Sequence, residues 1–121
     1  MELKEVMQQK SFAVLGDTVT PGKFAYRIKK EMQAAGYRVY AVGRERQTLN
    51  SIEDDLDIID LCMSPARSLP LLKENKKPFK CIVIQPGAES PELLAWLDEQ
   101  KLPYIQGCLL VGLAEYVNKK A

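Results

Sequence analysis

The sequence predicts an α/β fold: a three-layer, Rossmann-like, doubly wound parallel sheet of about five strands. Short apolar runs alternate with amphipathic segments of helical length along the 121 residues. The apolar runs are nearly continuous, which is typical of parallel strands covered by helices on both faces. Hydrophobic residues make up 46% of the chain and charged residues 27%, so length and composition fit one domain over residues 1–121. We expect a strand order of roughly 2-1-3-4-5, with the switch point between the first and third strands.

The first half of the chain predicts a strand, a helix and a second strand. Residues 12–15 are continuously apolar and end at Gly16, as in a buried strand. Residues 23–35 have the spacing of a helix with one inward face, which Gly36 ends as a C′ glycine. Three apolar residues would form that face: Phe24, Ile28 and Met32. The Arg-Val-Tyr-Ala-Val run at residues 38–42 is the second strand.

The next segment connects the second strand to the third. Residues 43–57 are too short and polar for a full crossover helix and strand. They predict one helical turn near residues 51–56, or a short extra strand near Thr48. The third strand follows at residues 58–63.

The second half continues the alternation of helices and strands. Leu69 and Leu72 predict a short helix. Because Pro70 has no N–H to donate, we expect this helix to start near Ser68 or to have an irregular first turn. The remaining elements are a strand at residues 81–84, a helix at 91–101, a strand at 103–105 and a closing helix at 111–118.

Composition excludes several function classes. The chain has 17 basic and 16 acidic residues, a net charge of +1, so we expect no general nucleic-acid binding. It has no histidine, which excludes His-based triads, His metal ligands and histidine pH switching. The cysteines Cys62, Cys81 and Cys108 are widely spaced with no CxxC pair, so we expect neither a disulfide framework nor a metal site.

The first ten residues and the hydropathy of the chain indicate where in the cell the protein is expected. Residues 1–10 are polar and lack the apolar stretch of a signal peptide. No apolar run approaches the ~20 residues that span a bilayer. We therefore expect a cytoplasmic protein with a small-molecule partner and no membrane partner. A homodimer or a partner protein is left open.

Three segments that follow strands have a hydroxyl residue before proline. They are Thr20-Pro21, Ser64-Pro65 and Ser90-Pro91. This pattern opens a helix, with the hydroxyl residue at the N-cap and proline at the first helical position. If all three open helices, three helix N-termini meet at the carboxyl edge of the sheet, where their free N–H groups suit a phosphate. Capping alone also accounts for these pairs.

The loop after the first strand is where a doubly wound fold approaches a nucleotide. It lacks the GxGxxG fingerprint, but Gly16 permits close backbone approach, Thr18 offers a hydroxyl and Lys23 a positive charge. These residues fit a phosphate-bearing ligand. After the second strand, Arg44 and Arg46 favour a phosphorylated ribose, as in NADP or coenzyme A. The same arginines are equally consistent with an ordinary surface.

Two residues raise the question of catalysis. Asp60 lies in the third strand, like the phosphorylated aspartate of response-regulator receivers, but Asp17 stands alone after the first strand and no lysine follows the fifth. We therefore predict that Asp60 is a strand residue hydrogen-bonded to a loop. Cys108 follows Gly107 at the carboxyl edge and could be a reactive thiol; the interpretation we favour is a packed or ligand-lining cysteine.

Five segments of this sequence occur together in one known family. They are residues 13–16 (AVLG), 35–42 (AGYRVYAV), 57–61 (DIIDL), 85–89 (QPGAE) and 107–109 (GCL). In these segments the chain resembles the small stand-alone CoA-binding proteins, whose Rossmann-like domain is similar to the nucleotide-binding domain of the succinyl-CoA synthetase alpha subunit. The resemblance covers residues 12–113. The chain differs from the usual family pattern at Gly43-Arg44, where Asn-Pro is usual, and at Met63-Ser64, where arginine is frequent.

The resemblance implies a protein that binds coenzyme A or acyl-CoA, with the ADP part across the carboxyl edge, and that has no reaction of its own. Its implied phosphate-facing residues are Gly16, Thr18 and Lys23, and we expect Thr20 in the same loop to belong to the site. The implied adenosine neighbours are Val42, Gly43 and Arg44. The implied opposite wall consists of Ser64, Pro65, Gln85 and Gly87. Two alternatives are an NADP- or other nucleotide-binding regulatory module, and an acyl transferase or carrier that uses Cys108.

Overall fold

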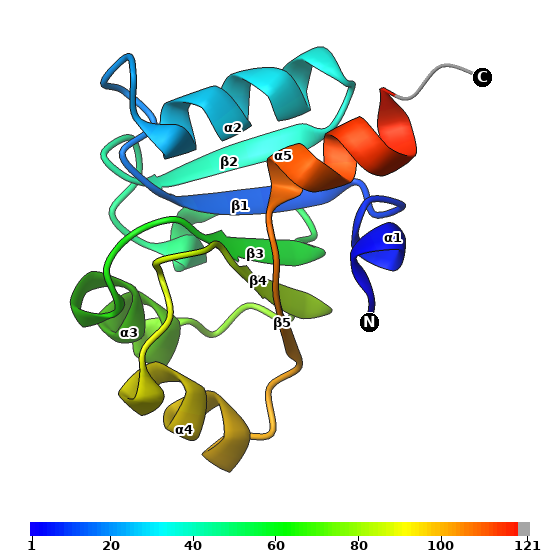
Figure 1. Cartoon of the computed structure of the whole chain (residues 1–121). Coiled ribbons are helices and arrows are strands. Elements are labelled where there is room, and N and C mark those ends of the chain that lie inside the picture. The colour runs from blue at the N-terminus through cyan, green and yellow to red at the C-terminus, as the bar shows by residue number, and fades with distance from the viewer. Residues whose placement is uncertain (119–121) are drawn as a thin grey trace.

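Five parallel strands form one sheet in the computed structural model, which describes residues 1–118 (Figure 1). The strands are β1 (Ser11–Gly16), β2 (Arg38–Gly43), β3 (Ile58–Leu61), β4 (Cys81–Ile84) and β5 (Tyr104–Gln106). Their order is β2-β1-β3-β4-β5, and every neighbouring pair is parallel. The predicted fold class and strand order are confirmed. The carboxyl ends of all five strands therefore lie at the same edge of the sheet, which we call the carboxyl edge.

Helices cover both faces of this sheet. They are α1 (Leu3–Val6), α2 (Phe24–Ala34), α3 (Pro65–Glu74), α4 (Pro91–Glu99) and α5 (Leu109–Gly112), which continues as a π-helical segment (Leu113–Val117). Figure 1 shows α2 and α5 on one side of the sheet and α3 and α4 on the other. In β1, Phe12 and Val14 pack with residues of α1, α2 and α5, whereas Ala13 and Leu15 pack with residues of α3 and α4.

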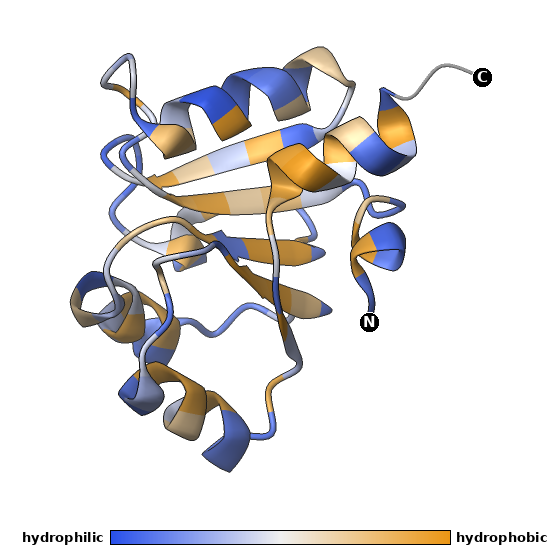
Figure 2. Ribbon diagram, in the orientation of Figure 1, coloured by the Kyte–Doolittle hydropathy of each residue, from blue (hydrophilic) through white to orange (hydrophobic). Residues whose placement is uncertain are grey.

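The central strands are apolar because they are buried on both faces. Every residue of β1, β3 and β4 is buried. Figure 2 shows these strands mainly in the hydrophobic colour, while hydrophilic residues lie on the outward faces of the helices. Two polar residues interrupt these strands: Ser11, at the start of β1, and the ionisable Asp60, in the middle of the core. Burying it is costly unless it is paired or neutral, which marks this position for closer inspection.

Two of the three hydroxyl–proline pairs open helices. Ser64 and Ser90 are the N-caps of α3 and α4, and a proline occupies the first turn of each. Thr20-Pro21 does not open a helix: α2 begins at Phe24, close to the start at residue 23 that the apolar spacing predicts. Pro21 and Gly22 instead form the middle of a turn that is closed by a 3.2 Å hydrogen bond from the N–H of Lys23 to the carbonyl of Thr20. Gly22 has φ +92°, the conformation that a type II turn requires after proline.

Other boundaries also differ from prediction. Helix α3 starts at Pro65, earlier than expected from Pro70, which lies inside it and removes only one helical hydrogen bond. The turn after β2 is a 3₁₀ helix at Leu49–Ser51, and β3 ends at Leu61. Helix α1 is not predicted at all, because four residues are too few to show a periodicity. It matters nonetheless, because its Val6 is fully buried.

Candidate functional site

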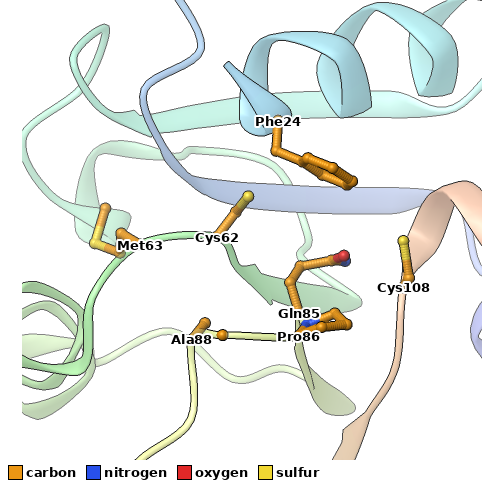
Figure 3. Close-up of a pocket in the computed structure, with 8 residues that line it drawn as sticks. Phe24, Cys62, Met63, Gln85, Pro86, Ala88 and Cys108 are labelled. Carbon is orange, nitrogen blue, oxygen red and sulfur yellow. The ribbon is translucent and has the colours of Figure 1, made fainter.

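A pocket of about 360 Å³ opens at the carboxyl edge of the sheet, between the starts of α2 and α5 (Figure 3). Its lining comes from four segments that are distant in sequence: Phe24, Cys62, Met63, Gln85, Pro86, Gly87, Ala88 and Cys108. None of these side chains is charged, so the pocket suits a neutral, largely apolar group of a ligand. Of the predicted site residues, Gln85 and Gly87 lie here. Cys108 lies here too, in keeping with the ligand-lining role that we favour for it.

Phe24 forms one wall of the pocket, and the prediction that it faces the core is wrong. Its side chain is 55% exposed, whereas Ile28 and Met32 on the same helix are fully buried. Phe24 is the first residue of α2. In this topology the start of the helix lies at the carboxyl edge. The side chain there faces the pocket and does not pack on the sheet. The signal that could have revealed this role is an apolar residue directly after Lys23 of the candidate phosphate loop.

Two buried polar side chains form a pair at the pocket. Asp60 in β3 is fully buried, and Gln85, directly after β4, is 2% exposed. Gln85 Nε2 donates a 2.6 Å hydrogen bond to Asp60 Oδ1, while Asp60 Oδ2 and Gln85 Oε1 have no hydrogen-bond partner within residues 1–118. Burial raises the pKa of Asp60 to about 7, although the bond from Gln85 acts in the opposite direction. The prediction that Asp60 is a strand residue hydrogen-bonded to a loop is confirmed.

The three free thiols have different surroundings. Cys62 and Cys108 are half-buried in the walls of the pocket, whereas Cys81 is buried within β4. Burial, and then the negative charge of Asp60, raises the pKa of Cys62 to about 12. Cys62 therefore remains a protonated thiol at neutral pH and is a poor nucleophile.

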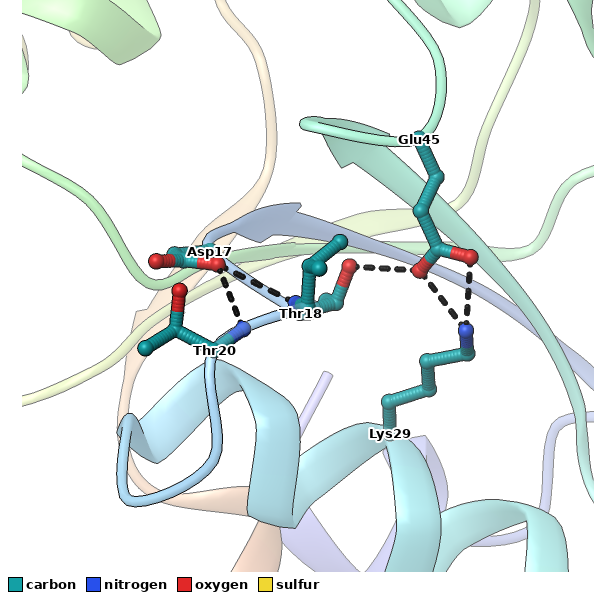
Figure 4. Close-up of polar contacts among 6 residues, drawn as sticks. Asp17, Thr18, Thr20, Lys29 and Glu45 are labelled. Carbon is teal, nitrogen blue, oxygen red and sulfur yellow. Dashed lines mark hydrogen bonds and ion pairs between the residues drawn. The ribbon is translucent and has the colours of Figure 1, made fainter.

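The loop after β1 is held by its own aspartate. Asp17 Oδ1 accepts hydrogen bonds from the N–H groups of Val19, at 3.1 Å, and Thr20, at 3.0 Å (Figure 4). Hydrogen bonding with Thr20 is the main cause that lowers the pKa of Asp17 to about 2, and the nearby Arg44 guanidinium adds to it. The Arg44 Nη1 atom lies 3.4 Å from Asp17 Oδ2. The loop after β1 and the loop after β2 are thus in contact.

A second contact joins the same two loops. Thr18 is buried, and its hydroxyl donates a 2.6 Å hydrogen bond to Glu45 Oε2 (Figure 4). The ammonium group of Lys29, in α2, contacts both carboxylate oxygens of Glu45, at 2.6 and 2.9 Å. Hydrogen bonds from Lys29, and then from Thr18, lower the pKa of Glu45. The hydroxyl that the sequence assigns to a phosphate is therefore bonded to a carboxylate in this structure.

The remaining predicted residues lie at the same edge in separate places. Gly16 and Gly43 are register partners at the ends of β1 and β2, and Val42 is buried beside them. Gly43 has φ +128°, and a Cβ atom there would lie 3.0 Å from the Gly16 carbonyl oxygen, so a side chain at this position would be strained. Lys23 and Thr20 are exposed in the loop after β1.

Ser64 and Pro65 lie in a different cavity from Gln85 and Gly87. They line a space of about 630 Å³ at the starts of α3 and α4, which Ser90 also borders. The four residues that the family resemblance implies for one wall of the ligand site are therefore divided between two cavities. Sequence reasoning missed the role of four pocket residues, Phe24, Met63, Pro86 and Ala88, and considered Cys62 only as one of three widely spaced cysteines.

Two further features concern residues 1–118. No three His, Cys, Asp or Glu side chains in this range come together in a way that could hold a metal ion. None of the helices formed by these residues is long and apolar enough to cross a membrane.

Comparison with known proteins identifies similar folds and the family of the chain. Solved structures of similar fold include a conserved hypothetical protein from Pyrococcus furiosus (24% identity, TM-score 0.74, 85% of this chain and 98% of that one). They also include a hypothetical protein from Pyrococcus horikoshii (21%, TM-score 0.83, 96% and 90%) and a protein from Thermus thermophilus (23%, TM-score 0.75, 96% and 99%). No curated protein matches the chain. The sequence model of the CoA binding domain matches residues 10–114, and the chain therefore belongs to the CoA-binding domain family.

Proposed function

We propose that this protein binds coenzyme A or acyl-CoA along the carboxyl edge of its sheet and catalyses no reaction of its own. Coenzyme A joins a phosphorylated adenosine to a neutral arm that contains amides and ends in a thiol. The observation that carries the proposal is the direct succession of Lys23 and Phe24. Lys23 is an exposed cation at the start of α2, and Phe24 is a wall of the uncharged pocket. A charged end and an apolar arm would thus find suitable environments side by side.

The phosphate end is proposed to lie on the loop after β1. Gly16, Thr18, Thr20 and Lys23 supply close backbone approach, two hydroxyls and one positive charge. Thr18 is bonded to Glu45 in this structure, so a phosphate at Thr18 would have to displace that carboxylate. Repulsion between two anions favours such a displacement, and Lys29 would then be released to face the ligand.

The adenosine end is proposed to lie beside Val42, Gly43 and Arg44. The contact between Arg44 and Asp17 is exposed, with 52% of the arginine side chain accessible, and ion pairs of this kind contribute little stability. Arg44 is therefore free to turn toward the 3′-phosphate of the ribose. Ser64 and Pro65 would border the ligand on the side of α3.

The absence of catalysis is proposed from the side chains in the pocket. The lining residues include no carboxylate or amine that could act as a general base. Cys62 is held as a protonated thiol by its raised pKa. These properties suit a binding site more than a site of acid–base catalysis.

Calorimetric titration of the purified chain with CoA, dephospho-CoA, NADPH and NADH tests the proposal. We expect CoA to bind most tightly and dephospho-CoA about tenfold more weakly, because one charge-assisted phosphate contact is lost. Arg44→Gln should remove the difference between CoA and dephospho-CoA. Arg27→Gln, an exposed arginine paired with Glu31 on α2, is the matched control and should keep the difference.

Other outcomes would support the alternatives. Tighter binding of NADPH than of CoA would favour the nucleotide-binding regulatory module. Stable acyl labelling of Cys108 by an acyl-CoA would favour the transferase or carrier. No binding of any of the four ligands would contradict the proposed function.

A further inference from the structure

Two thiols on different elements line the same pocket. Cys62 lies in the segment between β3 and α3, and Cys108 lies in the segment between β5 and α5. In Figure 3 the two thiols and the ring of Phe24 surround the amide end of Gln85. The pocket thus presents sulfur on two sides of the space that we assign to the thiol-bearing arm.

Gln85 gives independent reason to expect a ligand in this space. Its side chain is 2% exposed and its Oε1 atom has no hydrogen-bond partner within residues 1–118. A buried polar atom without a partner is unusual in a folded protein. The amide N–H groups of a pantetheine-like arm are donors of the kind that Gln85 Oε1 lacks.

The two thiols are not equivalent as nucleophiles. The reactive form of cysteine is the thiolate. Cys62 is disfavoured, because burial and the neighbouring Asp60 raise its pKa to about 12. Cys81 is buried inside β4 and does not line the pocket. Cys108 is the remaining thiol, half-buried and open to the pocket.

We propose that Cys108 undergoes thiol–disulfide exchange with the disulfide form of the CoA-type ligand. This inference rests on the proposed function, because the non-covalent site must first bring the ligand to the pocket. The thiolate of Cys108 attacks one sulfur of the ligand disulfide. A bond forms between Cys108 Sγ and that sulfur, the ligand S–S bond breaks, and the other half leaves as a thiolate that takes up the proton released by Cys108. The ligand disulfide is the oxidant, so no further co-reactant is required.

The loop after β4 favours this exchange over acyl transfer. Attack on a thioester develops negative charge on oxygen and needs hydrogen-bond donors to stabilise it. The N–H of Gly87 already donates to Glu89 Oε2 at 2.8 Å, and that of Ala88 donates to the carbonyl of Gln85 at 2.9 Å. Pro86 has no N–H. Exchange between sulfurs develops no such oxyanion and therefore needs no donors there.

Mass spectrometry of the intact chain tests the inference. The reduced protein is incubated with CoA disulfide and, separately, with glutathione disulfide. We expect a single adduct of one CoA, located on Cys108 by peptide mapping and removed by dithiothreitol. It should form about tenfold faster than the glutathione adduct, because binding raises the effective concentration of the matching disulfide. Cys62→Ser should keep the adduct and Cys108→Ser should lose it; mapping of the unmodified chain gives the same answer if either variant folds poorly.

The results separate this inference from the proposed function. Calorimetry with reduced CoA, under reducing conditions, measures the non-covalent site alone. Binding of CoA without an adduct from CoA disulfide would overturn the exchange and leave the proposed function standing. An adduct on Cys62, or equal rates with both disulfides, would also overturn it. Failure of reduced CoA to bind would overturn the proposed function, and with it the inference that depends on it.

Discussion

The buried carboxyl of Asp60 accepts a 2.6 Å hydrogen bond from the side-chain amide of Gln85, which joins β3 to the loop that lines the pocket. Each residue also has one oxygen without a partner within residues 1–118. Asp60 is fully buried and has no cationic partner, so the neutral form of its carboxyl is favoured over the charged form. This relationship makes the stability of the protein depend on pH.

We expect the free energy of unfolding to fall as the pH rises from 5 to 8. Asp60 has a pKa of about 7 in the folded state and 3.8 as its ordinary value. Between these values the folded state binds the proton and the unfolded state does not, so raising the pH costs stability, by about 2–3 kcal/mol over this range. Asp17 and Asp57 have lowered pKa values and act at lower pH.

Asp60→Asn isolates this effect. An asparagine can accept the hydrogen bond from Gln85 Nε2 and has no charge at any pH in this range, as is true of the protonated acid. Urea unfolding of the variant should show little change between pH 5 and 8. The exposed Asp55→Asn is the control and should keep the wild-type slope. If the stability of the wild-type protein does not decline between pH 5 and 8, the raised pKa of Asp60 is ruled out.

Gly16→Ala is expected to destabilise the fold. A Cβ atom at this position would lie 2.6 Å from the carbonyl oxygen of Cys62 and 2.8 Å from Ala25 Cβ, so β1, α2 and the segment after β3 would have to separate. We expect a loss of about 2 kcal/mol in urea unfolding. Gly107→Ala is the matched control, since its Cβ would meet only Leu3 Cδ1, at 4.0 Å. Equal stability of the two variants would show that the close approach at Gly16 is not needed.

Phe24→Ala is expected to separate binding from stability. Because the side chain is 55% exposed, its removal should change the free energy of unfolding by less than about 1 kcal/mol. The same removal takes away one apolar wall of the pocket and should weaken CoA binding about tenfold, as measured by calorimetry. Tyr116→Ala, another exposed aromatic residue, is the control for non-specific effects. Unchanged affinity in Phe24→Ala would contradict the placement of the arm in this pocket.

Glu45→Gln is expected to strengthen CoA binding by about threefold at low ionic strength. The substitution removes a negative charge that holds the hydroxyl of Thr18 and the ammonium group of Lys29. A phosphate would then compete for these groups without anion–anion repulsion. Glu31→Gln, on the same helix as Lys29 and paired with Arg27, should leave the affinity unchanged. Weaker binding in Glu45→Gln would indicate that Glu45 itself contacts the ligand.

The fold could be predicted largely because strands that are buried on both faces of a sheet have a recognisable apolar sequence. The runs at β1, β3 and β4 are apolar at nearly every position, and the helices between them have one inward face. Helix α1 was not predicted, because four residues are too few to show a helical periodicity. The helix predicted at residues 23–35 agrees closely with α2, whereas Thr20-Pro21 does not open it, because Pro21-Gly22 fits a turn as well as a helix start.

The site could be predicted only in part. Gln85, Gly87 and Cys108 follow strands directly, and topology alone brings them to the carboxyl edge. The exposure of Phe24 could not be predicted, because helical spacing does not tell which way the first residue of a helix faces. The bond between Thr18 and Glu45 depends on how two loops meet in space, which no local pattern records.

Phe24, at the start of α2, and Cys108, directly before α5, are distant in sequence but line the same pocket. The pocket therefore takes its walls from both halves of the polypeptide. Occupancy of the cavity therefore requires that both segments are folded in place, and a saturating ligand should protect both against local unfolding.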